Sequence, residues 1–278
     1  MSKKNDSIEN SPIPSDRYTE EYFLQHSDGY DEFQSTQGKQ LPPRIKKALE
    51  LAGIKPGMVI LDIGCGRGEM LYHAHHHGAT IWGMDYSSAA IHIISQTFQS
   101  LNPNQVGSQI RVQIANASSL PYIKHNFDIV FLLDVVEHLT PHEFEMTLNE
   151  ISRVLRKDGK VIIHTMPNLW YYRFGYPLYR TFQSMRGITL PKDPRDRWAF
   201  KDVHVNEQTP RSLSQTLKRF GFDVKIDVTS VMTYSHESNP IIRKVMILIS
   251  RAPGLRWFIG NDIFAIAKKR PISLTDSS

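Results

Sequence analysis

The sequence has 278 residues, of which 40% are hydrophobic and 22% charged, a composition typical of a globular protein. No run approaches the roughly 18–20 apolar residues of a membrane span, and the polar N-terminus lacks an apolar signal segment. Cys65 is the only cysteine, which excludes an intrachain disulfide. These features predict a cytoplasmic protein, and we expect residues 1–16 to form a disordered tail.

The charge is distributed unevenly along the chain. Residues 1–150 hold 11 Lys and Arg against 18 Asp and Glu, whereas residues 151–278 hold 22 against 10. A basic half is typical of proteins that meet an anionic substrate, a membrane surface or nucleic acid. A solvated basic face is an equally good interpretation.

The periodicity of apolar residues predicts the elements in chain order. Residues 17–57 form a helical cap, with a short aromatic helix at 18–24 and a longer one from Pro43 to Gly53. Strands are then predicted over residues 58–63, 80–85, 110–115, 127–133 and 160–165. Helices are predicted between them, over residues 68–77, 87–101 and 141–155. This alternation over residues 58–168 indicates a parallel sheet covered on both faces.

The pattern changes after Asn168. Residues 169–203 are an aromatic and basic insert, and a helix at 210–220 and a strand at 222–229 follow. Within residues 204–278, a second insert with two apolar stretches occupies residues 232–260, before a last strand at 262–268. We expect residues 17–278 to form a single domain.

A glycine-rich loop, Gly-Cys-Gly-Arg-Gly at residues 64–68, follows the first predicted strand. Ligands of open α/β sheets bind at this point, where glycines allow close approach and a helix start offers free N–H groups. The dinucleotide fingerprint has its third glycine one position later, and Asp62 would repel a pyrophosphate. Asp62 suits the cationic amino end of S-adenosylmethionine, and Asp85 can accept hydrogen bonds from ribose hydroxyls. The loop therefore favours S-adenosylmethionine over NAD.

Several segments resemble the class I S-adenosylmethionine-dependent methyltransferases, in their small-molecule, ubiquinone and menaquinone branch. The segments are residues 59–68, 82–87, 115–122, 127–130, 134–139 and 204–210. The resemblance implies a Rossmann-like, doubly wound α/β sheet of seven strands, the last antiparallel, with inserts that form a substrate lid. The family usually has Asp where this chain has Asn116, whose carbonyl oxygen can still accept a hydrogen bond from the adenine amino group.

The resemblance also implies the cofactor, S-adenosylmethionine, and the residues that hold it. These are Asp62, Gly64, Cys65, Gly66, Gly68, Asp85, Tyr86, Asn116, Ala117, Leu133 and Asp134. Asp62 and the loop would face the methionine part, beside Leu133 and Asp134. Asp85 would hold the ribose, Tyr86 would stack near the adenine, and Asn116 with Ala117 would read its edge.

Two histidines are candidate general bases for methyl transfer. His138 follows the fourth strand and His204 follows the first insert, and histidine is the usual base near neutral pH. His138 could instead cap the next helix or pack under the cofactor. Asp134, Glu137 and the two histidines could also bind a metal, since their spacing is similar to that of small-RNA 2′-O-methyltransferases. We expect no metal.

The inserts should determine the acceptor. Tyr18 and Tyr22 from the cap, with Trp170 and Tyr171 from the first insert, are expected to contact it. Apolar and basic residues together predict a small lipophilic or anionic acceptor, methylated on oxygen or carbon, or a surface that rests on a membrane. A small accessory core would give the same pattern. An RNA 2′-O-methyltransferase and a non-catalytic cofactor-binding protein are the alternatives, and no pattern indicates an oligomeric state.

Overall fold

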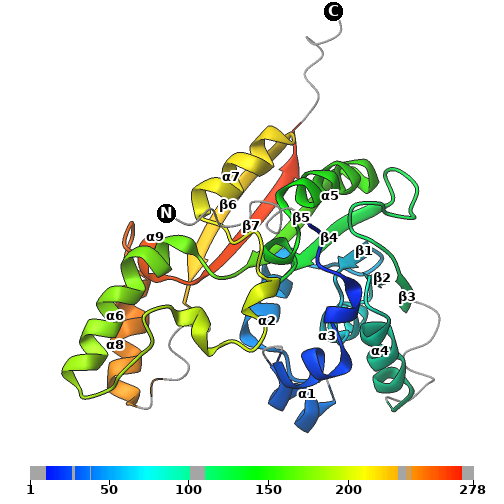
Figure 1. The fold of residues 1–278 in the computed structure, drawn as a ribbon. Coiled ribbons are helices and arrows are strands. Elements are labelled where there is room, and N and C mark those ends of the chain that lie inside the picture. Colours follow the sequence, from blue (N-terminus) through cyan, green and yellow to red (C-terminus); the bar gives the residue numbers. More distant parts are fainter. Residues whose placement is uncertain are drawn as a thin grey trace, which may run out of the picture.

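The computed structural model describes residues 11–26, 29–37, 39–100, 110–230, 237 and 239–270. Seven strands form one sheet in the order β3-β2-β1-β4-β5-β7-β6, and only β7 runs against its neighbours (Figure 1). The strands are β1 Val59–Ile63, β2 Thr80–Asp85, β3 Ile110–Ile114, β4 Phe127–Leu133, β5 Leu155–Thr165, β6 Phe222–Thr229 and β7 Asp262–Lys269. The predicted doubly wound sheet with an antiparallel last strand is confirmed.

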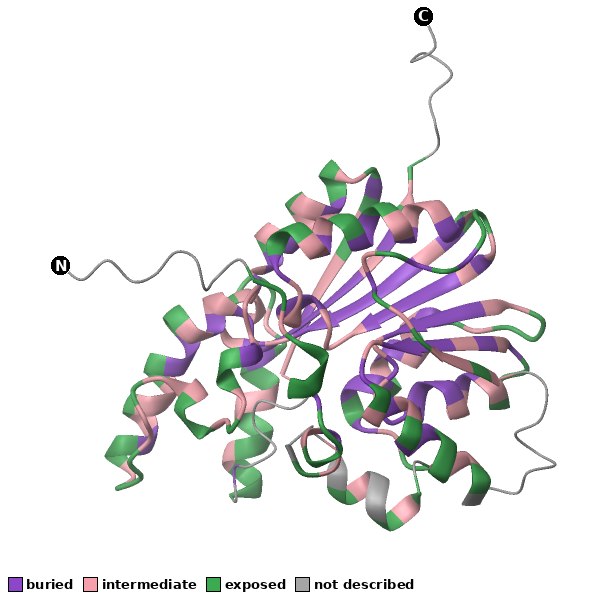
Figure 2. Cartoon of the chain, turned by 45° about the vertical axis from the view of Figure 1, so that its right-hand side comes forward, coloured by how far each residue is buried: buried purple, intermediate pink, exposed green. Residues whose placement is uncertain are grey.

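Helices cover both faces of the sheet, whose strands are largely buried (Figure 2). Alternate residues of each strand point to opposite faces. Ile60 therefore belongs to the core beneath α2 Pro43–Ala52, α3 Glu69–His76 and α4 Ser88–Ser100. Leu61 belongs to the core beneath α5 Pro141–Val154 and α7 Pro210–Arg219. This sandwich fixes the carboxyl ends of β1, β2 and β4 at one edge.

The boundary between α5 and β5 differs from the prediction. We expected the helix to reach residue 155 and the strand to begin at residue 160, whereas β5 begins at Leu155. Leu155 is buried and pairs with Phe127, and the register then shifts before Ile129. Gly159 allows this because a Cβ there would lie 2.8 Å from Cγ of Leu155. The pairing of Leu155 with Phe127 therefore places Leu155 in the strand, although its spacing from the apolar residues of α5 predicted a helix.

The N-terminal segment is more ordered than the predicted tail and cap. Residues 1–10 lie outside the described chain. Residues 11–16 are exposed except for the half-buried Ile13, and η1 spans Ser15–Arg17. The hydroxyl of Tyr86 donates a hydrogen bond to the carbonyl of Ile13 at 2.9 Å. Ile13 is therefore held against the body. The predicted aromatic helix is instead the π-helix η2 Tyr22–His26, which α1 Tyr30–Thr36 follows, and Tyr18 precedes it.

The two inserts form a side lobe, which we define as residues 169–191 and 239–260. It contains η4 Tyr171–Gly175, α6 Tyr176–Met185, α8 Pro240–Ser250 and α9 Arg256–Ile259, and it projects beside the sheet (Figure 1). The short helices η5 Pro194–Arg197 and η6 Lys201–Val203 lead back to the body. Of the helices in the described chain, none is long and apolar enough to cross a membrane.

The side chain of Asn168 ties the two parts of the side lobe together. Its Nδ2 donates to the carbonyls of Trp257 and Gly260 at 2.9 and 2.8 Å, and its Oδ1 accepts from the N–H of Trp170 at 3.0 Å. The ring of Trp170 also stacks on Phe258, with centroids 5.2 Å apart. Asn168 is fully buried, so these bonds replace lost contacts with water.

Candidate active site

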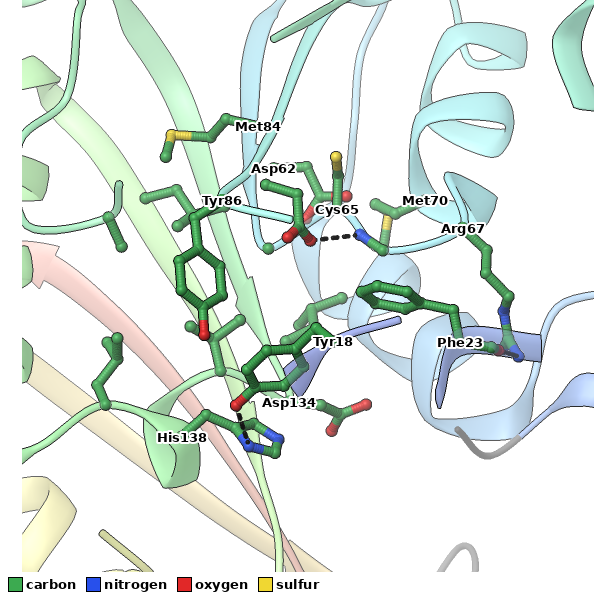
Figure 3. A pocket seen from close by; sticks show the side chains of 18 of the residues that line it. Tyr18, Phe23, Asp62, Cys65, Arg67, Met70, Met84, Tyr86, Asp134 and His138 are labelled. Atoms are coloured by element: carbon green, nitrogen blue, oxygen red, sulfur yellow. Dashed lines mark hydrogen bonds between the residues drawn. The ribbon is translucent and has the colours of Figure 1, made fainter. Parts of the chain in front are cut away.

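A pocket opens at the carboxyl ends of β1, β2 and β4, under the N-terminal segment (Figure 3). Ten of the predicted cofactor residues line it: Asp62, Gly64, Cys65, Gly66, Asp85, Tyr86, Asn116, Ala117, Leu133 and Asp134. Tyr18, Tyr22 and His138 line it as well, whereas Gly68, Trp170, Tyr171 and His204 lie outside it. These ten predicted cofactor residues therefore line a single pocket. No residue of the first insert, residues 169–203, lines this pocket.

The backbone of the glycine loop is used differently from the prediction. We expected its N–H groups to face the ligand, but those of Gly64 and Cys65 donate to the carbonyl of Met84 at 2.8 and 3.0 Å. The N–H of Gly66 donates to Oδ2 of Asp85 at 3.1 Å. These bonds fasten the loop to the end of β2. The N–H groups of Gly64, Cys65 and Gly66 are therefore used within the chain and do not form a cradle for a phosphate.

Two loop residues have packing roles. Gly68 begins α3 with φ +88°, and a Cβ there would lie 3.1 Å from Cγ1 of Ile94 on α4. The missing side chain of Gly68 lets α3 and α4 approach each other. The residue therefore has a packing role and does not line the pocket. Cys65 is buried, and Asp85 and Asp62 add to that burial in raising the pKa of its thiol. The thiol stays protonated, which excludes it as a nucleophile near neutral pH.

The pocket wall carries an excess of buried negative charge. Burial raises the pKa of Asp62 well above its usual range, and the charges of Asp85 and Glu69 add to the effect. Burial also raises the pKa of Asp85 to about 6, although the N–H groups of Ser87 and Gly66 stabilise its charge. Burial destabilises the ionised form of each carboxyl group, and a cation beside it would remove this cost. The site is therefore complementary to a positively charged ligand.

Arg67 connects the glycine loop to the N-terminal segment, a role that we did not predict. Its Nε donates to Oε1 of Glu69 at 2.8 Å, and its Nη1 donates to the carbonyl of Phe23 at 2.9 Å. All of these atoms belong to buried side chains or to η2. Arg67 thereby holds η2 over the pocket.

A second buried network fixes Asp134, whose backbone has φ +56°. Nε of Arg44 donates to its Oδ2 at 2.5 Å, and Nδ1 of His164 donates to its Oδ1. Nε2 of His164 lies 3.3 Å from Oδ1 of Asp262. Burial alone would raise the pKa of Asp134 and lower that of His164. Arg44 and His164 nevertheless hold the pKa of Asp134 well below its usual range, and the carboxylates raise that of His164 to about 9.

Sequence analysis missed Arg44, His164 and Asp262, although each leaves a signal. Arg44 is a cation on the same helical face as Ala48. His164 interrupts an apolar strand, and Asp262 begins another. A charged group at a core position must have a partner, so each of these positions indicates a buried polar contact, although the sequence does not show which residue is the partner.

His138 lies in hydrogen-bond contact with Tyr18 at the pocket wall (Figure 3). Its Nδ1 lies 3.1 Å from the hydroxyl of Tyr18 and 3.1 Å from the carbonyl of Val203. A carbonyl oxygen only accepts, so Nδ1 carries the proton and Nε2 keeps a free lone pair. Burial, helped by the charge of His204, lowers the pKa of His138 to about 3. The imidazole is neutral near pH 7.

His204 lies one layer behind His138. The two rings meet edge to face, with centroids 4.8 Å apart, and Trp198 covers His204 from the other side at 4.9 Å. Nδ1 of His204 and Oε1 of Glu207 are buried 3.8 Å apart, and neither has a hydrogen-bond partner in the described chain. His204 does not line the pocket, and its ring reaches the pocket wall only through that of His138.

The residues of the predicted metal alternative are used by other contacts. Glu137 accepts a hydrogen bond from the hydroxyl of Thr165 at 2.7 Å, and Asp134 is bound to Arg44 and His164. In the part of the chain that the structure describes, no three His, Cys, Asp or Glu side chains are placed to hold a metal ion.

Asn116, Trp170 and Tyr171 make contacts within the chain that the sequence did not indicate. Oδ1 of Asn116 already accepts from the N–H and hydroxyl of Ser118 at 2.9 and 2.6 Å, which uses both lone pairs meant for the adenine. Trp170 stacks on Phe258 inside the side lobe, and Tyr171 is buried there. The pocket is covered by Tyr18, Tyr22 and neighbouring residues of the N-terminal segment instead.

Comparison with known proteins identifies the family. A family model for the methyltransferase domain matches residues 61–163. Demethylmenaquinone methyltransferase of Oceanobacillus iheyensis is 27% identical over 195 residues, which cover 66% of this chain and 77% of the relative. The 2-phytyl-1,4-naphtoquinone methyltransferase of Trichormus variabilis is 30% identical over 176 residues, which cover 62% and 70%.

The fold is shared with solved structures as well. Geranyl diphosphate methyltransferase in complex with S-adenosylmethionine aligns with a TM-score of 0.55 at 17% identity, over 88% of this chain and 92% of that one. The chain therefore belongs to the class I S-adenosylmethionine-dependent methyltransferases, in the branch that resembles the ubiquinone and menaquinone enzymes, and S-adenosylmethionine is its methyl donor.

Proposed function

We propose that this enzyme transfers a methyl group to an oxygen or carbon atom of a small, lipophilic acceptor, and that residues 17–278 act as one domain. The observation that carries the proposal is His138, a neutral base with a free Nε2, in the wall of an acidic pocket under an aromatic cap. All seven strands belong to one sheet, which supports the single domain.

The acidic wall fits the cofactor. S-adenosylmethionine, when bound, supplies an electrophilic methyl group on a positively charged sulfur. Asp62 would face its ammonium group, and Asp85 would accept hydrogen bonds from the ribose hydroxyls. Both carboxylates have pKa values raised by burial, so a cation nearby restores the stability of their charged forms. Leu133 and Asp134 would lie beside the methionine part.

The adenine would occupy the side of the pocket lined by Tyr86, Asn116 and Ala117. Ser118 occupies Oδ1 of Asn116, which leaves the amide nitrogen of Asn116 as the group that can donate to the base. We therefore assign a donor role at this position, in place of the acceptor role that the sequence indicated.

His138 would act on the acceptor through Nε2. The hydrogen bond from Nδ1–H to Val203 fixes the tautomer, so Nε2 can accept a hydrogen bond from an acceptor hydroxyl or an acidic C–H group. With a pKa near 3 the imidazole is a weak base. Its main contribution is therefore orientation of the acceptor atom, an effect worth up to ~7–11 kcal/mol. The acceptor's proton would pass to Nε2 of His138 as the bond to the methyl carbon forms, and from there to solvent.

The acceptor class rests on the relatives and on the cap. Two relatives act on demethylmenaquinone and on 2-phytyl-1,4-naphtoquinone, which are apolar quinones. In this chain Tyr18, Tyr22, Phe23 and Phe200 form an aromatic cluster at the pocket. The rings of Tyr22 and Phe200 lie 5.3 Å apart and join the cap to the end of the first insert. An aromatic, apolar acceptor suits these surroundings.

The test is transfer of labelled methyl from S-adenosylmethionine to a panel of quinols, catechols, lipid extracts and RNA transcripts. We expect label in quinol-type acceptors, and the product's mass spectrum gives the methylated atom. His138→Ala should lower kcat by ~10²–10⁴-fold with little change in cofactor affinity. His204→Ala, one layer behind, should lower it by only about tenfold. Label in RNA that depends on an added metal ion would overturn the proposal.

A further inference from the structure

The side lobe leaves two helices with exposed apolar faces. On α8, Ile241, Val245 and Leu248 are 72%, 49% and 70% exposed. At 3.6 residues per turn these positions lie within about 60° of one another, so they form one stripe. On α6, Leu178 and Met185 are 69% and 76% exposed, and their spacing of seven residues also places them on one face. Apolar faces of this kind mark interaction surfaces.

Basic residues are in excess around these faces. Residues 169–191 contain three basic residues and residues 239–260 contain four, with no Asp or Glu in either range. Glu237 pairs with Arg186 and Asp227 pairs with Arg256, so part of this charge is neutralised. Arg243, Lys244 and Arg251 are exposed, and within the described chain no carboxylate pairs with them. The surface therefore combines apolar side chains with unneutralised positive charge, which is the pattern of helices that lie at an anionic lipid interface.

The topology places this surface beside the pocket. β5 and β6 both run parallel to β1, because β7 is antiparallel to each of them. The first part of the lobe follows the end of β5, and the second follows the end of β6. Both parts therefore leave the edge of the sheet at which the pocket opens, and Figure 1 shows α6 and α8 on that side of the molecule.

We propose that the side lobe docks the enzyme on an anionic lipid bilayer. The apolar stripes of α6 and α8 enter the interface, while Lys244 and Arg251, which flank the stripe of α8, contact acidic headgroups. This binding is independent of the acceptor's identity, because no residue of the lobe lines the cofactor pocket. It goes beyond the methyl transfer itself and brings the pocket to the phase in which a lipophilic acceptor is dissolved.

Flotation of the full chain with vesicles tests the proposal without any acceptor. We compare vesicles of phosphatidylcholine with vesicles that contain 30% phosphatidylglycerol, and we expect roughly tenfold stronger partitioning on the anionic ones, lost at high salt. Ile241→Ser with Leu248→Ser should weaken it by roughly tenfold. Lys244→Gln with Arg251→Gln should do the same on anionic vesicles only.

Ile123→Ser with Lys124→Gln is the matched control, since both residues are exposed in a loop far from the lobe. This pair should leave partitioning unchanged, and all variants should keep the calorimetric affinity for S-adenosylmethionine. Equal partitioning on the two vesicle types, or an equal loss in the control pair, would overturn the proposal. So would a native dimer that fails to bind vesicles and becomes monomeric in the Ile241 and Leu248 variant, because a second copy would then cover the stripe.

Discussion

The pocket and the side lobe place the same kinds of residue in opposite environments. At the pocket, charged side chains are buried and paired, as Arg44 is with Asp134 and Arg67 with Glu69. In the lobe, apolar side chains such as Leu248 are exposed, and so are the basic side chains of Lys244 and Arg251. Buried pairs are satisfied within the chain, whereas an exposed apolar stripe is satisfied by a partner. The pocket residues therefore find their partners within the fold, whereas the apolar stripe of the lobe needs a partner outside the chain.

The largest effect expected at the pocket comes from its first glycine. Gly64 has φ +72°, and a Cβ there would lie 2.4 Å from Cγ2 of Val135. Gly64→Ala should lower the free energy of unfolding by about 2–5 kcal/mol, from backbone strain and overpacking. It should also weaken S-adenosylmethionine binding by roughly 100-fold, because the loop must move away from Val135.

Gly53→Ala separates the two causes. Gly53 also has positive φ, at +54°, but nothing lies within 4 Å of its Cβ position. This variant should lose only the strain, about 1–2 kcal/mol, and keep its affinity for the cofactor. Urea unfolding and titration calorimetry measure both quantities. Equal affinities in the two variants would show that the clash at Val135 does not matter.

The next effect concerns the stability of the buried network. The pKa of His164 is raised to about 9, so its protonated form is favoured in the folded state. The resulting stabilisation is complete below pH 6.5 and is lost as the pH rises through 9. We expect the free energy of unfolding to fall by up to about 3 kcal/mol over this window. His164→Gln should flatten the profile, while His92→Gln, at an exposed site, should leave it intact.

Cofactor affinity should depend on pH through Asp85. Its pKa is raised to about 6, and the ionised form accepts the ribose hydroxyls in our proposal. Binding should therefore be about tenfold weaker at pH 5 than at pH 7, with the charged form restored as the pH rises. Calorimetry on Asp85→Asn should show weak binding without this dependence. Asp62→Asn is the comparison, and a dependence lost only there would assign the titration to Asp62.

These tests concern features that the sequence revealed to different degrees. Periodicity indicates where the strands lie, and the glycine loop with Asp62 and Asp85 indicates the ligand site. The antiparallel β7 and the place of Asn116 are implied by the resemblance to the methyltransferases, and the strand order comes from the structure. The start of β5 at Leu155 follows from none of these signals, because pairing with Phe127 across the sheet determines it. Boundaries set by tertiary contacts leave little trace in a single segment.

The partners of buried charges are the other unpredicted part. The sequence shows that Arg44 lies on an apolar face, but only the fold shows that Asp134 meets it. Likewise, Trp170 and Tyr171 were expected at the acceptor because they are aromatic. Their rings pack inside the lobe, since Asn168 anchors this insert to the second one. Composition alone does not tell an accessory core from a binding wall.

The smallest expected effect on the pocket comes from that anchor. Asn168→Ala leaves the carbonyls of Trp257 and Gly260 without donors, at a cost of about 1–3 kcal/mol. If the pocket and the lobe are independent, this variant should speed hydrogen exchange in residues 169–191 and 239–260 while cofactor affinity changes less than about twofold. Asn116→Ala should do the reverse, since Asn116 lines the pocket and has no part in the lobe. A large loss of cofactor affinity in Asn168→Ala would mean that the lobe supports the pocket directly, and the vesicle experiments would then have to be interpreted as tests of both regions together.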